Sequence, residues 1–216
     1  MIKFNFKIDK ETITAEVPEG WHEVKIKHLV NLENKWSGNK SDMIGLLSAF
    51  TSCTYEQLEQ AKGNLWEPLF GVMAFVFNSP KWDKLKKQPL LSIGNKLVKA
   101  PKKLELETFG QKVLAMNVIA SEGEQINKIP EILAIYLQPA IDGKFITDRV
   151  EQIKEDVLNM YALEAMPYGI FFFKKLLRLR SYGRIGLKAS RRIRKQLVFI
   201  AKQAQISYNN LQTSLQ

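Results

Sequence analysis

The chain opens with alternating apolar and polar positions, which is typical of a half-buried strand. The apolar positions fall into two groups on either side of a polar stretch at 9–12: Ile2, Phe4, Phe6 and Ile8, and then Ile13, Ala15 and Val17. This pattern predicts a β-hairpin. Pro18-Glu19-Gly20 ends its second strand.

From Trp21 onward the spacing of apolar residues becomes helical, with Ile26, Leu29 and Val30 at i, i+3 and i+4. Ser41 or Asp42 is placed to cap a second helix. Thr54 and Gln57 have the spacing of a capping box, which predicts a third helix.

The segment Leu65–Phe77 is apolar nearly all round, with Pro68 in its first turn. A helix without a polar face has to be buried in the core or against another subunit. From Asn78 to Lys103 the periodicity fails, and we expect a long loop. Within it, Gly94-Asn95 predicts a small hairpin that joins 91–93 to 97–98.

Capping signals predict three helices in the central part of the chain. Thr108 with Gln111 repeats the capping-box spacing, Pro130 is placed to start a helix at 131–137, and Asp148 with Glu151 gives a third N-cap. Pro167 is expected to open a further helix, and a last long helix runs from Leu187 toward Ser207.

These elements predict a mainly α fold in which an N-terminal β-hairpin is followed by a multi-helix body and a long basic C-terminal helix. We divide the chain into an N-terminal hairpin and helical part (1–80), a loop or excursion (81–103), a central helical part (104–164) and a basic helical C-terminal segment (165–216).

Composition places the chain among folded proteins, since 45% of its 216 residues are hydrophobic and 25% are charged. Cys53 is the only cysteine, so no intrachain disulfide forms and we expect a reducing compartment. The charged N-terminus is unlike a secretory signal, and no apolar run reaches the roughly 20 residues of a membrane span. We therefore expect a soluble protein.

The net charge of +10 belongs to the end of the chain. After Glu164 there is no Asp or Glu, whereas Lys and Arg together occur 11 times. Such segregation predicts an anionic partner, whether nucleic acid, an acidic protein surface or lipid headgroups. The alternative is a solvated face that binds nothing.

A helical wheel of the last helix puts basic residues on one face and Ile193, Leu197, Ile200 and Ala204 on the opposite face. The apolar stripe would dock on the body while the basic stripe meets phosphates. An interfacial membrane helix ranks third, since the apolar stripe is narrow. The candidate polyanion-binding residues are Arg178, Arg180, Arg184, Lys188, Arg191, Arg192, Lys195 and Lys202.

Other residue types give little indication of catalysis. His22 and His28 are six residues apart and do not make a zinc pair, and Cys53 is not distinguishable from a buried thiol. Neither a Gly-x-x-x-x-Gly-Lys loop nor a Gly-x-Gly-x-x-Gly turn is present. Gly183-Arg184-Ile185-Gly186 has the Gly-x-x-Gly form of a phosphate-clamping loop but lacks the flanking pattern of a KH module, so a helix-breaking turn is the favoured interpretation. We predict no catalytic residues, no metal and no cofactor, and expect a non-enzymatic protein. We expect the assembly surface to use apolar anchors: Trp66, Phe70, Phe171, Phe172 and Phe173.

Several local patterns resemble small virion and assembly proteins of tailed bacteriophages, particularly the crAss-like phages of Bacteroidetes. These patterns are found in six stretches of the sequence: residues 17–24, which follow the hairpin, residues 44–47, 55–58, 108–111 and 129–137, and the three phenylalanines at 171–173. The basic C-terminal extension lies outside this resemblance.

The resemblance implies a structural or cargo component of a virion, in its neck, tail or ejected contents, made in the bacterial host cytoplasm. Its partners would be other virion proteins and further copies of itself. The charge of the basic segment, which lies outside the resemblance, predicts non-specific DNA contact in addition. The alternatives are a tail assembly chaperone and a free nucleic-acid-binding protein.

Overall fold

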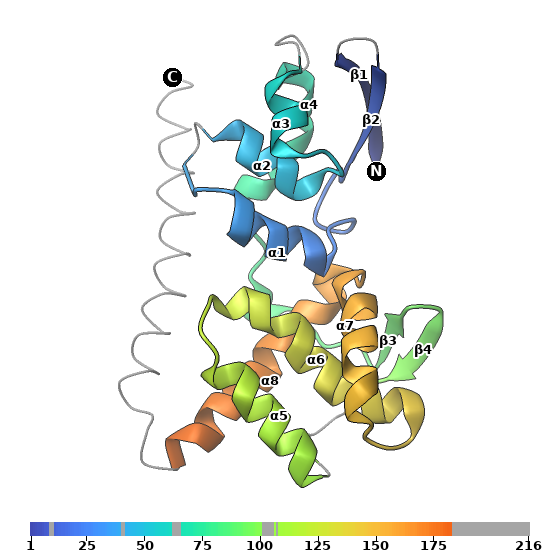
Figure 1. Ribbon diagram of the computed structural model, residues 1–216, viewed down its shortest axis with the longest axis vertical. Coiled ribbons are helices and arrows are strands. Elements are labelled where there is room, and N and C mark those ends of the chain that lie inside the picture. The colour runs from blue at the N-terminus through green and yellow to red at the C-terminus, as the bar shows by residue number, and fades with distance from the viewer. Residues whose placement is uncertain (9–10, 40–41, 62–65, 101–105, 107, 183–216) are drawn as a thin grey trace.

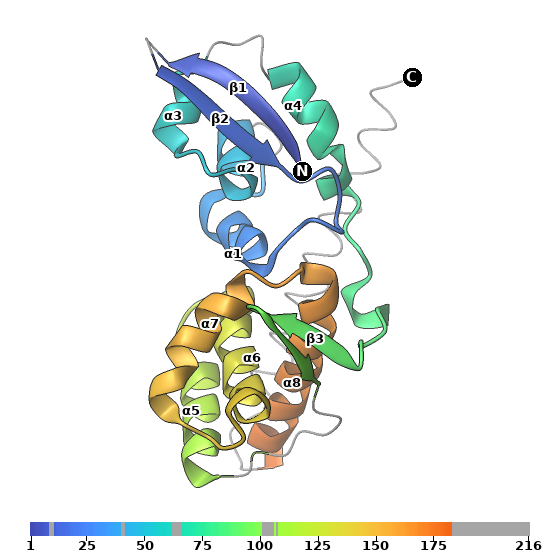
Figure 2. The same cartoon turned by 90° about the vertical axis from the view of Figure 1, so that its right-hand side faces the viewer.

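The computed structural model describes residues 1–8, 11–39, 42–61, 66–100, 106 and 108–182. These residues form two lobes stacked along the long axis (Figures 1 and 2). The N-terminal lobe holds strands β1 (Ile2–Ile8) and β2 (Glu11–Val17) with helices α2 (Met43–Phe50), α3 (Tyr55–Glu59) and α4 (Trp66–Met73). Helix α1 (Ile26–Lys35) lies where this lobe meets the second one.

The second lobe contains α5 (Phe109–Ala120), α6 (Gln125–Asp142), α7 (Val150–Leu158) and α8 (Ala162–Tyr182), together with β3 (Leu90–Ile93) and β4 (Lys96–Lys99). The buried apolar residues of both lobes form one connected core. The mainly helical body and the N-terminal hairpin are as predicted, whereas the predicted C-terminal helix lies outside the described residues. The four-part division of the chain stays a prediction.

The N-terminal hairpin is confirmed as an antiparallel pair in which Ile2 faces Val17 and Phe6 faces Ile13. Phe6, Ala15 and Val17 are buried, so one face of the hairpin packs on the lobe. A two-stranded sheet is only marginally stable by itself. Here helix α4 contacts β2 and supplies the missing apolar surface.

The predicted caps of α2 and α3 are present. The Asp42 carboxylate accepts a hydrogen bond from Gly45 N, and Thr54 and Gln57 form the reciprocal capping box. The predicted continuous helix 65–77 is instead two pieces, since α4 is followed by the 3₁₀ helix Ala74–Phe77.

The small hairpin expected around Gly94-Asn95 is present as β3 and β4. Gly94 has φ of +56°, a left-handed conformation that a side chain would strain. A Cβ at this position would also meet the Asp156 carboxylate at 3.1 Å. The turn therefore requires glycine both for its backbone and for its contact with α7.

Helix α6 differs from the prediction because Pro130 does not start it. The helix begins at Gln125 and runs through both Pro130 and Pro139. Pro139 has no N–H to donate to the carbonyl oxygen of Ile135, four residues earlier. Gln111 of α5 donates from Nε2 to that same oxygen at 2.9 Å and thus replaces the hydrogen bond that proline removes.

Two further helix starts also differ from the predictions. Asp148 does not cap α7, because a 3₁₀ turn at Thr147–Arg149 leads into the helix and Arg149 is its N-cap residue. Helix α8 begins at Ala162, so Pro167 is inside it rather than at its start. Helix α8 thus begins before the proline that the local signal places in its first turn, whereas α7 begins after the residue predicted to cap it.

Helices α6 and α8 form the centre of the second lobe. The rings of Tyr136 and Phe172 stack with centroids 4.0 Å apart and an interplanar angle of 11°. Gly169 allows this approach, since a Cβ there would meet Ile129 at 2.7 Å.

A short backbone pairing joins the two lobes at the start of α1. Ala162 N donates to Val24 O at 2.7 Å, and Ile26 N donates to Met160 O at 3.0 Å. Beside it, the Trp21 indole N–H donates to the carbonyl oxygens of Phe75 and Asn78. The first turn of α1 is thus hydrogen-bonded to the junction of α7 and α8.

Candidate polyanion-binding surface

The structure reaches only the beginning of the predicted basic segment. The backbone of Arg178 and Arg180 belongs to α8, but their side chains are outside the described part of the chain. The other six candidate residues also fall outside it: Arg184, Lys188, Arg191, Arg192, Lys195 and Lys202. Their positions remain a prediction.

The expected assembly residues have different surroundings. Trp66 and Phe70 belong to α4, but their side chains are not among those described. Phe172 and Phe173 are buried in the core of the chain itself, so an intermolecular role does not fit them. Phe171 is half-buried and faces a group of lysines.

Two lysines flank the Phe171 ring. Lys87 Nζ lies 3.2 Å from the ring centroid, and Lys175 Nζ lies 5.1 Å from it. Both distances are within the range of a cation–π interaction. Phe171 and Lys175 are one helical turn apart on α8, whereas Lys87 comes from the loop that follows the 3₁₀ helix Trp82–Lys84.

A hydrogen bond fixes the loop that carries Lys87. The Tyr168 hydroxyl donates to the carbonyl oxygen of Gln88, the next residue along the loop. The 3₁₀ helix itself also packs against α8. The segment 81–88, which includes this 3₁₀ helix and the loop, has one acidic residue, Asp83, and four exposed lysines: Lys81, Lys84, Lys86 and Lys87.

The two ammonium groups repel each other. Partial burial, and then the charge of Lys175, lower the pKa of Lys87. Among the described residues, no carboxylate forms an ion pair with Lys87 or Lys175. An anion bound between them would relieve the repulsion and raise that pKa.

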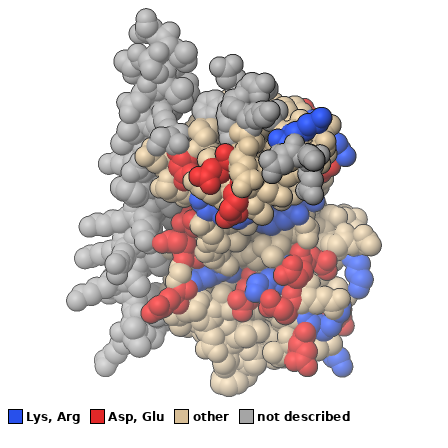
Figure 3. Space-filling view, turned by 45° about the horizontal axis from the view of Figure 1, so that its top comes forward, with Lys and Arg blue, Asp and Glu red and all other residues tan. Residues whose placement is uncertain are grey.

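Two other lysines of the described chain, Lys3 and Lys154, have acidic partners. Lys3 pairs with Glu16 and Lys154 with Glu151, each at 2.9 Å. On the face shown in Figure 3, acidic and basic side chains occur together. Lys87 and Lys175 therefore differ from these paired lysines and continue the excess of positive charge that begins after Glu164.

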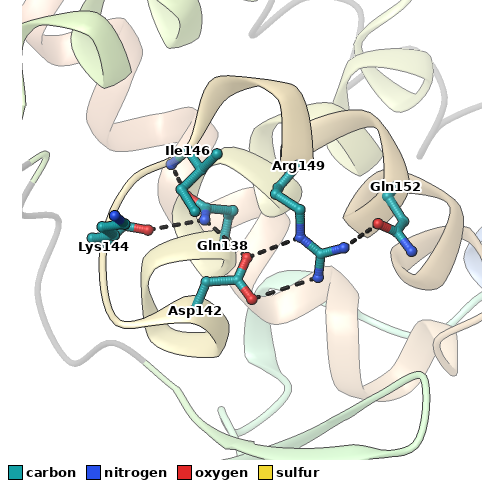
Figure 4. Close-up of polar contacts among 6 residues, drawn as sticks. All are labelled: Gln138, Asp142, Lys144, Ile146, Arg149 and Gln152. Carbon is teal, nitrogen blue, oxygen red and sulfur yellow. Dashed lines mark hydrogen bonds and ion pairs between the residues drawn. The ribbon is translucent and has the colours of Figure 1, made fainter.

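The most extensive polar cluster in the second lobe surrounds Gln138 (Figure 4). This buried amide donates to Asp142 and to Lys144 O at 3.0 and 2.9 Å, and it accepts from Ile146 N at 2.9 Å. Arg149 Nε lies 3.3 Å from Asp142 Oδ2. The bonds from Gln138, and then from Arg149, lower the pKa of Asp142. Every one of these contacts holds the turn between α6 and α7.

The buried titratable groups of the first lobe are also accounted for by packing. Burial lowers the pKa of His28 to about 4, and its Nδ1 accepts a hydrogen bond from Lys25 N. Burial raises the pKa of the Cys53 thiol. Within the described ranges, no group of three His, Cys, Asp or Glu side chains is arranged to hold a metal ion. No described helix is both long and apolar enough to cross a bilayer.

Sequence reasoning missed Lys87 and Tyr168. The density of lysines around Trp82 is a local signal for a basic loop, but the contact of that loop with α8 spans 80 residues and leaves no periodicity. Searches of protein-family models, curated proteins and solved structures found no match to this chain.

Proposed function

We propose that this protein is a non-enzymatic structural or cargo component of a bacteriophage virion that contacts an anionic partner through its basic C-terminal segment. The observation that carries the anionic partner is the complete lack of Asp and Glu after Glu164, over a stretch with 11 Lys and Arg. Charges of one sign without counter-charges are typical of surfaces that meet polyanions.

The described lysines at Phe171 support this proposal, because they extend the positive charge onto the folded body. Lys175 belongs to the same helix that leads into the basic segment, and Lys87 joins it from a loop held by Tyr168. A polyanion that follows the C-terminal segment would thus meet Lys175 and Lys87 as well. Non-specific contact with phosphates needs only such positioned cations.

The virion role rests on the local sequence patterns described above. It is tested by mass spectrometry of purified phage particles. Presence at a constant ratio to the major head or tail protein supports a resident component. Presence in infected cells and absence from mature particles would replace it with the assembly-chaperone alternative.

The polyanion contact is tested by titrating the full chain with duplex DNA at several salt concentrations. For the double variant Lys87→Gln and Lys175→Gln, the slope of log affinity against log salt should flatten by about 1.8, at roughly 0.9 per lost phosphate contact. Lys3→Gln and Lys154→Gln form the matched control, since both lysines have acidic partners. If the slope flattens equally in the control, the affinity for DNA depends on net charge and not on the position of Lys87 and Lys175.

The C-terminal basic stripe is tested separately. Replacing Arg191, Arg192 and Lys195 with glutamine should flatten the same slope by about 2.7. An unchanged slope in this variant would contradict DNA as the partner.

A further inference from the structure

The segment 78–89 connects the two lobes and is hydrogen-bonded at both of its ends. At its start, Asn78 O accepts a hydrogen bond from the Trp21 indole N–H at 2.9 Å. At its end, Gln88 O accepts one from the Tyr168 hydroxyl of α8. In Figure 2 the chain between α4 and β3 passes down the outside of the junction between the lobes. The side chains of this segment are therefore presented on a supported surface.

Trp82 is the one aromatic residue of 78–89, and it is half-buried. Its ring forms a T-shaped pair with that of Trp21, with centroids 5.2 Å apart and an interplanar angle of 89°. In such a pair the edge of one ring meets the face of the other, so Trp21 covers at most one face of Trp82. The Trp82 indole N–H donates to Ser79 Oγ at 3.1 Å, which fixes the orientation of the ring.

The lysines of the segment lie on both sides of Trp82 in the sequence. Asp83 is the one acidic residue among them. None of these lysines forms an ion pair with a carboxylate of the described residues. Lys174 and Lys175 of α8 are exposed as well, and the 3₁₀ helix that begins at Trp82 packs against α8. Cations without counter-charges over so short a stretch favour an anionic ligand.

An aromatic face next to such cations is the combination that binds single-stranded nucleic acids, since bases stack on the ring and ammonium groups contact the phosphates. We propose that the segment 78–89 binds single-stranded nucleic acid, with a base stacked on Trp82 and phosphates held by Lys81, Lys84 and Lys86. This goes beyond the polyanion contact of the C-terminal segment, because stacking requires unpaired bases and phosphate contact does not. It does not depend on residues 183–216.

Other anionic partners would use only part of this surface. In a duplex the faces of the bases are stacked on their neighbours, whereas single strands offer unstacked bases to aromatic side chains. A lipid surface requires apolar side chains that insert into it. Apart from Trp82, the half-buried Leu85 and two prolines, the side chains of 78–89 are polar or charged. An acidic protein would contact the lysines and leave the indole face unused.

Fluorescence anisotropy with the full chain tests the role of the bases. The probes are labelled oligo(dT), oligo(U) and an abasic deoxyribose-phosphate oligomer of equal length. Oligo(dT) or oligo(U) should bind at least about fivefold more tightly than the abasic oligomer, which is the lower bound expected for one stacked base. The tighter of the two identifies DNA or RNA as the ligand. Equal affinity for all three probes would overturn the proposal and leave the polyanion contact of the C-terminal segment intact.

Trp82→Leu should lower the affinity for the preferred oligonucleotide at least about fivefold and leave that for the abasic oligomer unchanged. Trp36→Leu is the matched control, since Trp36 is also half-buried and its indole N–H also has a partner, Asn39 O, at 3.0 Å. An equal loss of affinity in the two variants would overturn the proposal. Circular dichroism verifies that both variants are folded.

The salt dependence of binding tests the lysines. In the double variant Lys81→Gln and Lys84→Gln, the slope of log affinity for the oligonucleotide against log salt should flatten by about 1.4, at roughly 0.7 per lost phosphate contact of a single strand. The paired lysines Lys3 and Lys154 provide the control substitutions. An unchanged slope in the Lys81 and Lys84 variant would overturn the proposal.

Photo-crosslinking of the unaltered chain locates the bases without any substitution. Oligo(dT) that contains iododeoxyuridine forms adducts with aromatic side chains on which its bases stack, and mass spectrometry maps them. An adduct on Trp82 supports the proposal, and adducts confined to other residues, including 183–216, overturn it. A shift of tryptophan emission with phosphatidylserine vesicles but not with oligonucleotides would overturn it in favour of a lipid surface.

Discussion

The two lobes differ in the hydrogen-bond partners of their buried polar side chains. In the first lobe each of them bonds within its own helix or at that helix's end: Ser48 Oγ donates to Gly45 O at 3.0 Å, and Thr51 Oγ1 to Leu47 O at 2.9 Å. In the second lobe Gln111 joins α5 to α6, and Gln138 joins α6 to the loop before α7.

The difference shows where a lost hydrogen bond matters. A helix carbonyl that also accepts from Ser48 keeps its backbone partner when the serine is replaced. Gln111 and Gln138 instead bond to groups that the backbone does not otherwise satisfy, and a buried polar group without a partner costs about 1 to 3 kcal/mol. We expect substitutions in the second lobe to be the more destabilising ones.

The largest effect is expected for Gln138→Leu. This change leaves Ile146 N–H and Lys144 O without the bonds that Gln138 supplies, and it should lower the free energy of unfolding by about 3 kcal/mol. Urea denaturation at neutral pH measures the effect. Gln152→Leu on the exposed side of the same network is the control, with an expected change within about 0.5 kcal/mol. Equal midpoints for the two variants would contradict the bridging role.

The next largest effect concerns Gln111 and Pro139. Gln111→Leu should cost about 2 kcal/mol, because Ile135 O then loses the donor that stands in for the missing N–H of Pro139. Pro139→Ala restores a backbone N–H at that position. Most of the loss should therefore disappear in the double variant, and a purely additive result would show that the two residues are not coupled.

A pH dependence distinguishes the first lobe. The pKa of His28 is about 4 in the folded chain against an ordinary value of 6.5, so below pH 6.5 the unfolded chain takes up a proton that the folded chain does not. Above pH 6.5, His28 is neutral in both states and makes its full contribution to the free energy of unfolding. This contribution falls as the pH is lowered from 6.5 toward 4. Between pH 7.5 and pH 5.5 the loss should be about 1.4 kcal/mol.

His28→Gln provides the comparison for that measurement. Glutamine at this position can still accept from Lys25 N, since His28 occupies the N3 position of a capping box. The variant should keep the cap and lose this share of the acid sensitivity. If urea midpoints fall equally with pH in both proteins, other groups control the acid response.

The smallest effect is expected for Ser48→Ala. The lost hydrogen bond to Gly45 O is offset by the better helix propensity of alanine, so stability should change by no more than about 0.5 kcal/mol. Thermal unfolding would resolve a larger change. A loss as large as that of Gln111→Leu would remove the distinction between the lobes.

Local signals predicted the elements whose geometry is locally determined. The two hairpins and the caps at Asp42 and Thr54 depend on residues within a few positions of each other, and they are present. The predicted starts of α6 and α8 are wrong, because proline is typical of the first turn of a helix but Pro130 and Pro167 both lie inside these helices. Near Pro139, the hydrogen bond that proline removes is replaced by one from Gln111 of α5. A local sequence pattern in α6 does not include this residue.

The candidate surface was predictable only in part. The charge after Glu164 is visible in the sequence, and Lys175 belongs to it. The contribution of Lys87 depends on how its loop packs against α8, so it required the three-dimensional structure. The burial of Phe172 likewise depends on the packing of α8 on α6, where its ring stacks on that of Tyr136.

The backbone pairing between Val24 and Ala162 has a consequence for the order in which the protein matures during translation. Val24 leaves the ribosome early, but its partner is synthesised only after α5, α6 and α7. Until then the first turn of α1 has no α8 to bind. Contacts between α1 and α6 can form earlier, but this backbone link between the lobes has to wait for the start of the last described helix.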